Sequence, residues 1–172
     1  MNAAELPDDV RAAIGRVQYR QQSDFPVESG YVLTLCAAVE NGNPLYWDRE
    51  VADAITGGAT APLSMLSVWF RPHFWAPGRS GSVKPLQLHF DLKQRLDYPT
   101  AIITGNEVVF HAPVYLGDRL SACQVLKSVS ELKQTKLGTG RFWVIEMRYR
   151  NQRDELVGTD TYTCLGYRRE PA

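Results

Sequence analysis

The sequence is poor in the residues that most often carry metal or acid–base chemistry, with three cysteines and three histidines among 172 residues. The cysteines, Cys36, Cys123 and Cys164, are far apart and lie within apolar stretches. A metal site built from Cys and His needs ligands at much closer spacing. We therefore expect buried, unreactive thiols and no metal site.

The chain also lacks a surplus of either charge, since 19 Lys and Arg balance 19 Asp and Glu. Nucleic-acid-binding domains usually carry a basic surplus, and anionic membranes attract one. No apolar run approaches the ~20 residues that span a bilayer, and residues 1–15 lack the apolar core of a signal peptide. We expect a cytoplasmic protein that binds neither nucleic acid nor membrane, although a local basic patch for a phosphate-bearing ligand is compatible with this balance.

The length suits one domain with a substantial core. In the first half, helical spacing and helix-ending residues predict helices over residues 6–15 and 28–41, and Asp48 is a candidate cap for a short turn through residue 55. The stretch "ATAPLSMLSVWF", residues 59–70, is apolar on every side. It predicts a buried central helix, whereas residues 71–84 are rich in Pro, Gly and Ser and predict a loop.

The second half is rich in β-forming residues. In residues 140–151 the side chains of Trp143, Ile145, Met147 and Tyr149 alternate with more polar ones, which is typical of a sheet with one covered face. Similar stretches cover residues 101–114, 118–135 and 155–169, and the short connections between them favour antiparallel pairing. We predict a single α+β domain over residues 1–172, in which residues 1–25 are an N-terminal extension.

Several motifs in this order are similar to a known family. The string Asn43-Pro44-Leu45-Tyr46, the small-residue break and apolar run after it, and the later residues 106–114 and 117–120 together resemble MaoC-like (R)-specific enoyl-CoA hydratases. The resemblance is closest to the N-terminal-type half, the FAS1-like dehydratase domain, and covers about residues 31–168. It implies a hot-dog fold, in which a long central helix is wrapped by a curled antiparallel sheet.

The resemblance also implies a defective catalytic motif. Catalytic members carry Asp-x-Asn-Pro-Leu-His, whose Asp and His activate the water that adds to the enoyl double bond. In this chain the matching positions hold Asn41 and Tyr46. An amide does not titrate near neutral pH, and the reference pKa of tyrosine is near ~10. The resemblance thus implies a non-catalytic subunit that uses no cofactor and binds an acyl-CoA thioester as substrate.

Such inactive halves occur beside active ones in this family. The expected partner is a second MaoC-like hot-dog subunit that carries Asp-x-Asn-Pro-x-His, although the chain in isolation could form a homodimer. In such heteromers the inactive half lends a wall to the acyl tunnel. The expected substrates are bulky or long-chain 2-enoyl-CoAs of fatty-acid or steroid side-chain metabolism.

Candidate substrate-binding residues follow from the same comparison. The start of the predicted central helix would face the thioester carbonyl, but Pro62 removes one donor, and plain helix capping within a core is the favoured explanation of these residues. The aromatic cluster suits an acyl pocket or ordinary core packing, and arginines suit the phosphates of coenzyme A. The candidates are Asn43, Pro44, Thr60, Ala61, Pro62, Trp69, Phe70, Arg71, Phe74, Trp75 and Arg141.

Three alternatives stay open. A hot-dog acyl-CoA thioesterase needs a carboxylate near the central helix, and residues 57–70 contain none, so Glu50 or Asp53 would have to approach from outside. A non-enzymatic acyl-binding homodimer would bind acyl-CoA without turnover. An active hydratase would have to use Tyr46 and a water molecule held by Asn41.

Overall fold

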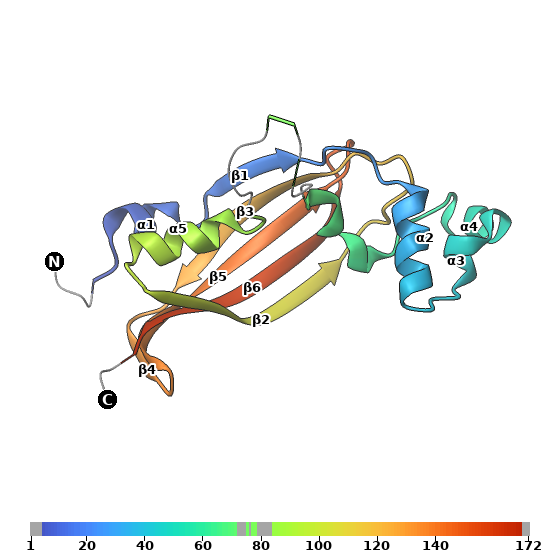
Figure 1. Cartoon of the computed structure of the whole chain (residues 1–172). Coiled ribbons are helices and arrows are strands. Elements are labelled where there is room, and N and C mark those ends of the chain that lie inside the picture. The colour runs from blue at the N-terminus through green and yellow to red at the C-terminus, as the bar shows by residue number, and fades with distance from the viewer. Residues whose placement is uncertain (1–4, 72–74, 76, 79–83, 170–172) are drawn as a thin grey trace.

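A six-stranded antiparallel sheet organises the computed structural model, which describes residues 5–71, 75, 77–78 and 84–169 (Figure 1). The strand order is β1-β3-β5-β6-β2, and the short β4 pairs with the beginning of β5. The strands are β1 Val17–Gln22, β2 Thr100–Phe110, β3 Ser121–Val129, β4 Lys133–Thr135, β5 Gly138–Arg150 and β6 Leu156–Arg168. The antiparallel sheet predicted for the second half is confirmed.

The alternation in β5 sets the two faces of the sheet. Trp143, Ile145, Met147 and Tyr149 are buried, and the residues between them are partly exposed. The turn to β6 begins at Asn151, whose side-chain oxygen accepts hydrogen bonds from the main-chain N–H groups of residues 153 and 155. One face therefore carries the core, and we call the opposite one the outer face.

The first half of the chain supplies the helices α1 Asp8–Ala13, α2 Ser29–Ala38, α3 Pro44–Trp47 and α4 Arg49–Thr56. The predicted helices over residues 6–15 and 28–41 are confirmed, whereas the short turn expected over residues 48–55 is the helix α4. Asp48 caps α4 as expected, because its carboxylate accepts hydrogen bonds from the main-chain N–H groups of Glu50 and Val51. Helix α4 ends at Gly57, which takes a left-handed conformation with φ of +73°.

The predicted central helix over residues 59–70 is wrong. The N–H of Ala61 donates to the carbonyl oxygen of Val114 at 2.8 Å, and Thr60 forms a bridge with Tyr115. These pairings hold the segment extended up to Pro62, and two short 3₁₀ turns follow, η1 Leu63–Met65 and η2 Val68–Phe70. Met65, Leu66 and Trp69 are buried nevertheless. An apolar run can be buried without forming a helix if its main-chain polar groups find other partners. Here the main chain of residues 59–61 forms hydrogen bonds with residues 114–116 instead.

The helix that packs on the core face of the sheet is α5 Gln87–Arg95, which the sequence analysis did not anticipate. It buries Leu88, His89 and Leu92. Gln124 of β3 fixes its start, since the side-chain oxygen accepts from the N–H of Leu88 at 2.9 Å. The α+β class holds, but the position of its helix in the sequence differs.

Residues 8–22 contribute to this core, where an N-terminal extension was expected over residues 1–25. β1 pairs with β3, and the buried side chain of Val10 joins α1 to the core. In Figure 1, α1 and α5 lie over one face of the sheet, α2–α4 gather beyond one of its ends, and β4 lies at the other end. The sheet therefore separates the helical segment α2–α4 from the β4–β5 hairpin.

Candidate functional site

The turn between α2 and α3 holds the motif positions. The side-chain oxygen of Asn41 accepts a hydrogen bond from the N–H of Asn43 at 3.0 Å, and the side-chain oxygen of Asn43 caps α3 by accepting from the N–H of Leu45 at 3.1 Å. Pro44 occupies the first turn of α3, where its missing N–H costs nothing. Both asparagine side chains therefore use their oxygens to shape the backbone.

Tyr46 lies on α3 and packs partly against the core cluster. Burial raises the pKa of its phenol, and the nearby Cys36 raises it further. The phenol consequently stays protonated at neutral pH and does not act as a base. The two motif positions together offer an amide and a neutral phenol, in place of the carboxylate and imidazole that serve as proton acceptors in acid–base sites.

Two of the four aromatic candidates, Trp69 and Phe70, take part in packing. Trp69 is buried and meets Phe25 and Tyr31 edge-on, with ring centroids 6.3 and 6.1 Å apart, which ties α2 to η2. Phe70 contacts Tyr149 of β5 at 5.4 Å between centroids. Trp75 is 78 % exposed, and Phe74 lies outside the described residues.

Three polar residues on the core face of the sheet form a cluster that sequence reasoning missed. Asp160 is only 6 % exposed and accepts hydrogen bonds from the phenol of Tyr162, at 2.5 Å, and from the amide of Asn106. Burial, followed by the bond to Asp160, raises the pKa of Tyr162, while the positive charge of Arg71 opposes this shift. Arg71 therefore acts on the same region as the Asp160 cluster.

The remaining candidates do not gather at one place. Thr60 and Ala61 form the bridge to residues 114–115, and Pro62 begins η1, so no long helix begins there to face a carbonyl. Arg141 is 4 % exposed at the start of β5 and donates to the carbonyl oxygen of Ser130 at 2.8 Å. It lines a hollow of about 520 Å³ near β4, at the opposite end of the sheet from Asn41 (Figure 1).

The acids proposed for a thioesterase lie on the exposed surface of α4. Asp53 forms an ion pair with Arg49 at 2.8 Å, and Glu50 is exposed in the first turn. Among the described residues, no group of three or more His, Cys, Asp or Glu could hold a metal ion. Within that same part of the chain, no helix is long and apolar enough to cross a membrane.

The arrangement of α5 over a curled antiparallel sheet defines a protein of the hot-dog class. Structures with this architecture align along most of the chain. A chain of the ChsH1-ChsH2 complex from Mycobacterium tuberculosis aligns with a TM-score of 0.75 and 23 % identity, covering 96 % of this chain and 94 % of that one. A chain of the HadBC (3R-hydroxyacyl-ACP dehydratase) complex of the same organism aligns with a TM-score of 0.60 and 21 % identity, covering 90 % of this chain and 97 % of that one. The (R)-hydratase from A. caviae aligns with a TM-score of 0.54 and 18 % identity, covering 91 % of this chain and 97 % of that one.

The family follows from the sequence match. The model of the FAS1-like dehydratase domain region matches residues 12–160, and the chain belongs to this MaoC-like family. A probable enoyl-CoA hydratase alpha subunit of Thermomonospora curvata is 31 % identical over 176 residues, a match that covers 98 % of this chain. The chain spans 54 % of the length of that relative.

Proposed function

We propose that this chain is the non-catalytic, acyl-CoA-binding half of a heteromeric enoyl-CoA hydratase. The observation that carries the proposal is the pair of motif positions: Asn41 cannot exchange protons near neutral pH, and the pKa of Tyr46 is raised rather than lowered. The chain contributes binding and orientation, while a second hot-dog subunit with an intact Asp and His moves the protons. The related alpha subunit and the two complexes named above support a heteromer.

The proposed partner surface is the free edge of β2. In the described part of the chain, β2 pairs with β6 alone, and nearly all of its residues are exposed. Ile103, Val109 and Phe110 are among them, so the edge combines unpaired main-chain groups with apolar side chains. A strand of the partner can extend the sheet here by main-chain hydrogen bonding.

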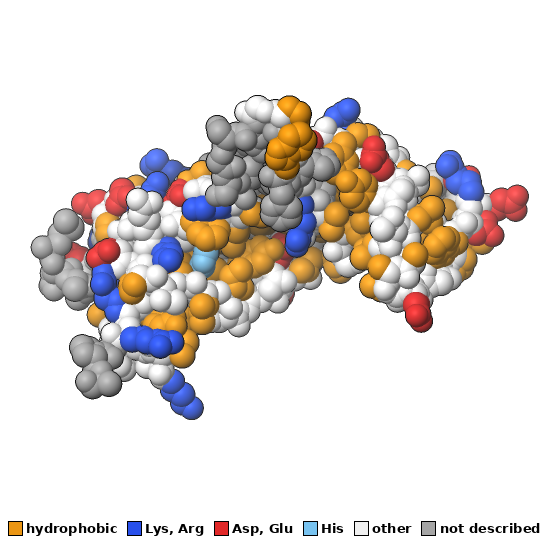
Figure 2. Space-filling view, in the orientation of Figure 1, with side chains coloured by type: hydrophobic (Ala, Val, Ile, Leu, Met, Phe, Trp, Pro, Cys, Tyr) orange, Lys and Arg blue, Asp and Glu red, His pale blue; other side chains and the backbone are white. Residues whose placement is uncertain are grey.

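A second apolar surface lies on the helices at the end of the sheet. Tyr31, Val39, Trp47 and Ile55 are exposed there, and Figure 2 shows hydrophobic side chains over this part of the molecule. Exposed charges, among them Glu40 and Asp48, lie directly beside these apolar side chains, so the surface combines apolar and polar contacts, as protein interfaces commonly do. We assign this surface to the same partner. Trp47 directly follows Tyr46, and the partner's catalytic Asp and His must supply the proton transfer that Asn41 and Tyr46 lack.

The proposed substrate is a bulky or long-chain 2-enoyl-CoA, as in fatty-acid or steroid side-chain metabolism. Phe70 and Tyr149 provide an aromatic wall on the core face, and the Asp160–Tyr162 pair provides a polar position beside it. Arg71 is the cation whose charge reaches this region. The single domain and the cytoplasmic location stay predictions.

The test is reconstitution. The chain is purified alone and co-expressed with a hot-dog protein that carries Asp-x-Asn-Pro-x-His, and hydration of trans-2-enoyl-CoAs from short-chain to steroid-sized is measured. We expect turnover only in the complex, abolished by replacing the partner's motif Asp with Asn. Asn41→Ala in this chain should alter kcat of the complex by no more than about threefold, because it removes no proton-transfer group.

Two outcomes contradict the proposal. Turnover by the purified chain alone, lost in Tyr46→Phe, assigns the chemistry to this chain. Release of free thiol from saturated acyl-CoAs without hydration of enoyl-CoAs supports the thioesterase instead. Far-UV circular dichroism of each variant verifies that it folds.

A further inference from the structure

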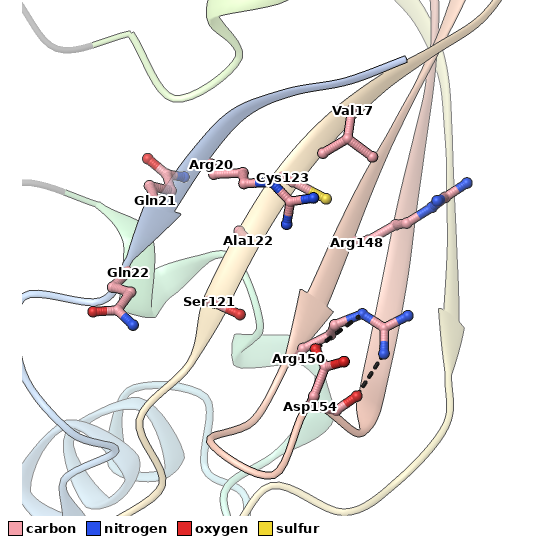
Figure 3. A pocket seen from close by; sticks show the side chains of 10 residues that line it. All are labelled: Val17, Arg20, Gln21, Gln22, Ser121, Ala122, Cys123, Arg148, Arg150 and Asp154. Carbon is pink, nitrogen blue, oxygen red and sulfur yellow. Dashed lines mark hydrogen bonds and ion pairs between the residues drawn. The ribbon is translucent and has the colours of Figure 1, made fainter. Parts of the chain in front are cut away.

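Three arginines line a hollow of about 660 Å³ on the outer face of the sheet (Figure 3). Arg20 belongs to β1, and Arg148 and Arg150 belong to β5. Cys123 and Ser121 of β3 lie between them, since their direct cross-strand partners are Arg148 and Arg150. Directly paired residues share a face, so this face is the one opposite the buried Met147 and Tyr149. The hollow is therefore separate from the core-face region around Asp160.

The cations around this hollow exceed the anions. Arg148 donates to Glu146 at 2.6 Å, and Lys127 approaches the same carboxylate at 3.4 Å. Arg150 donates to the carbonyl oxygen of Asp154 at 2.5 Å and lies 3.7 Å from its carboxylate. Four cations thus meet two carboxylates, in a chain whose formal net charge is zero. Arg20 forms no ion pair or side-chain hydrogen bond within the residues that the structure describes, so its guanidinium is available to a ligand.

A β-bulge in β1 places Arg20 beside the hollow. Gln18 pairs with Gln124 and Gln21 pairs with Ala122, so β1 carries one extra residue between these pairs. Tyr19 takes φ of +49°, which is unfavourable for a residue other than glycine. Its phenol donates to Asp91 of α5, and this contact holds the bulge from the helix side. Bulges commonly re-aim a side chain at a functional site, and this one leaves Arg20 lining the hollow.

From this geometry we propose that the hollow binds a phosphate monoester. Guanidinium groups match phosphate oxygens in charge and in the spacing of their paired N–H donors. Only one donor nitrogen of Arg148 is committed to Glu146, so this arginine keeps further donors, and both it and Arg20 line the hollow. The volume lies within the ~300–1,000 Å³ of small-molecule sites and accommodates a phosphate with an attached nucleoside. The phosphate belongs to a free phosphorylated metabolite or to the 3′-phosphate of coenzyme A. The proposal does not rest on the hydratase role.

Calorimetric titration of the purified chain, at constant ionic strength, tests the site. The ligands are inorganic phosphate, adenosine 3′,5′-bisphosphate, adenosine, coenzyme A and dephospho-coenzyme A, which lacks the 3′-phosphate. We expect inorganic phosphate and adenosine 3′,5′-bisphosphate to bind and adenosine not to bind, and we compare coenzyme A with dephospho-coenzyme A to separate the two sources of the phosphate. Arg20→Gln should weaken binding by about tenfold, as for the loss of one charge-assisted contact. Arg16→Gln is the matched control, because Arg16 is an equally exposed neighbour that does not line the hollow.

Cys123 provides a second readout inside the hollow. Cys36 and Cys164 are buried as expected, whereas the expectation of burial is wrong for Cys123, which is partly exposed because it lies on the outer face of β3. Modification by N-ethylmaleimide should therefore occur first at Cys123, and Cys123→Ser should remove this fast phase. Saturating adenosine 3′,5′-bisphosphate should slow the fast phase in the wild type and in Arg16→Gln, and slow it less in Arg20→Gln.

The results separate the sources of the phosphate and decide the proposal. Tighter binding of coenzyme A than of dephospho-coenzyme A, lost in Arg20→Gln, identifies the 3′-phosphate as the ligand. Equal binding of the two, together with binding of the bisphosphate, identifies a free metabolite. The proposal is overturned if no phosphorylated ligand binds at millimolar concentration, or if Arg20→Gln and Arg16→Gln weaken binding equally.

Discussion

The indole Nε1 of Trp47 donates a hydrogen bond to the main-chain oxygen of Asn41 at 2.7 Å. This contact closes the turn that carries both motif positions, and it uses the backbone of Asn41 rather than its side chain. Any residue at position 41 offers this main-chain oxygen, so the indole contact does not depend on whether Asn or Asp stands there. The proposed loss of the proton-transfer groups is therefore compatible with an intact turn.

Trp47→Phe should loosen this turn without unfolding the protein. The substitution removes the only donor that the side chain offers, and Trp47 is half exposed, so little apolar burial is lost. We expect faster hydrogen exchange at the amides of Asn43 and Leu45, with a thermal midpoint close to that of the wild type. Trp75→Phe, at an exposed tryptophan elsewhere, should leave both amides unchanged. Equal exchange in Trp47→Phe and the wild type would show that the indole contact does not hold the turn.

Gly166→Ala should destabilise the fold. A Cβ at Gly166 would lie 2.5 Å from the Trp143 ring and 2.6 Å from the Tyr98 ring, so both buried aromatic side chains would have to shift. Overpacking of this kind costs about 1–3 kcal/mol. The free energy of unfolding from urea titration measures the loss. Gly105→Ala is the control in a neighbouring strand, because the nearest atom lies 3.8 Å away, and it should change stability by less than about 0.5 kcal/mol. An equal loss in both variants contradicts the packing argument.

The ion pairs of Glu146 should make the stability of the fold depend on pH. Burial opposes its ionisation, but the hydrogen bond and charge of Arg148, with Lys127, outweigh burial and hold its pKa below the usual value. Because the folded-state pKa is depressed, the contribution is present above the unfolded value of 4.5 and is lost as pH falls through the folded pKa. Urea midpoints of the wild type should therefore exceed those of Glu146→Gln at pH 7 and converge with them toward pH 3. A constant difference across this range excludes the effect.

Ile103→Lys combined with Val109→Lys should weaken assembly through β2. Both side chains are exposed on the edge strand, so the monomer loses little burial, while lysine on an edge disfavours strand pairing. We expect the dissociation constant of the complex, measured by sedimentation, to rise about tenfold or more. Leu137→Lys, at an exposed leucine in the β4–β5 hairpin, is the matched control. If the control weakens assembly and the β2 variant does not, the partner binds at the opposite end of the sheet.

Features encoded by neighbouring residues could be predicted from the sequence, and features that need distant pairing could not. The alternation in β5 appears directly in consecutive residues, and the Asp48 cap needs only the next three. The helix predicted over residues 59–70 is wrong because an apolar run is compatible both with a buried helix and with a buried extended segment. Only the pairing of Ala61 with the distant Val114 shows that the backbone there is extended. Helix α5 was not predicted because it has few apolar residues, and polar residues on its solvent side interrupt their helical spacing.

The candidate site divides in the same way. Asn41 and Tyr46 could be found because their motif is contiguous in the sequence. Asp160 and Asn106 are 54 residues apart and meet only through the register of β2 with β6. Arg71 and Arg141 are both cations near turns, and nothing in the sequence indicates that they belong to different ends of the sheet.

The free edge of β2 also bears on how the chain is produced. A strand of eleven residues with one unpaired edge and several exposed apolar side chains can recruit strands from any other chain, including further copies of itself. Copies synthesised in excess of whatever covers this edge would aggregate or become targets of proteases. If the proposed partner covers this edge, its supply sets the amount of this chain that a cell can keep folded, and balanced synthesis of the two follows as a requirement.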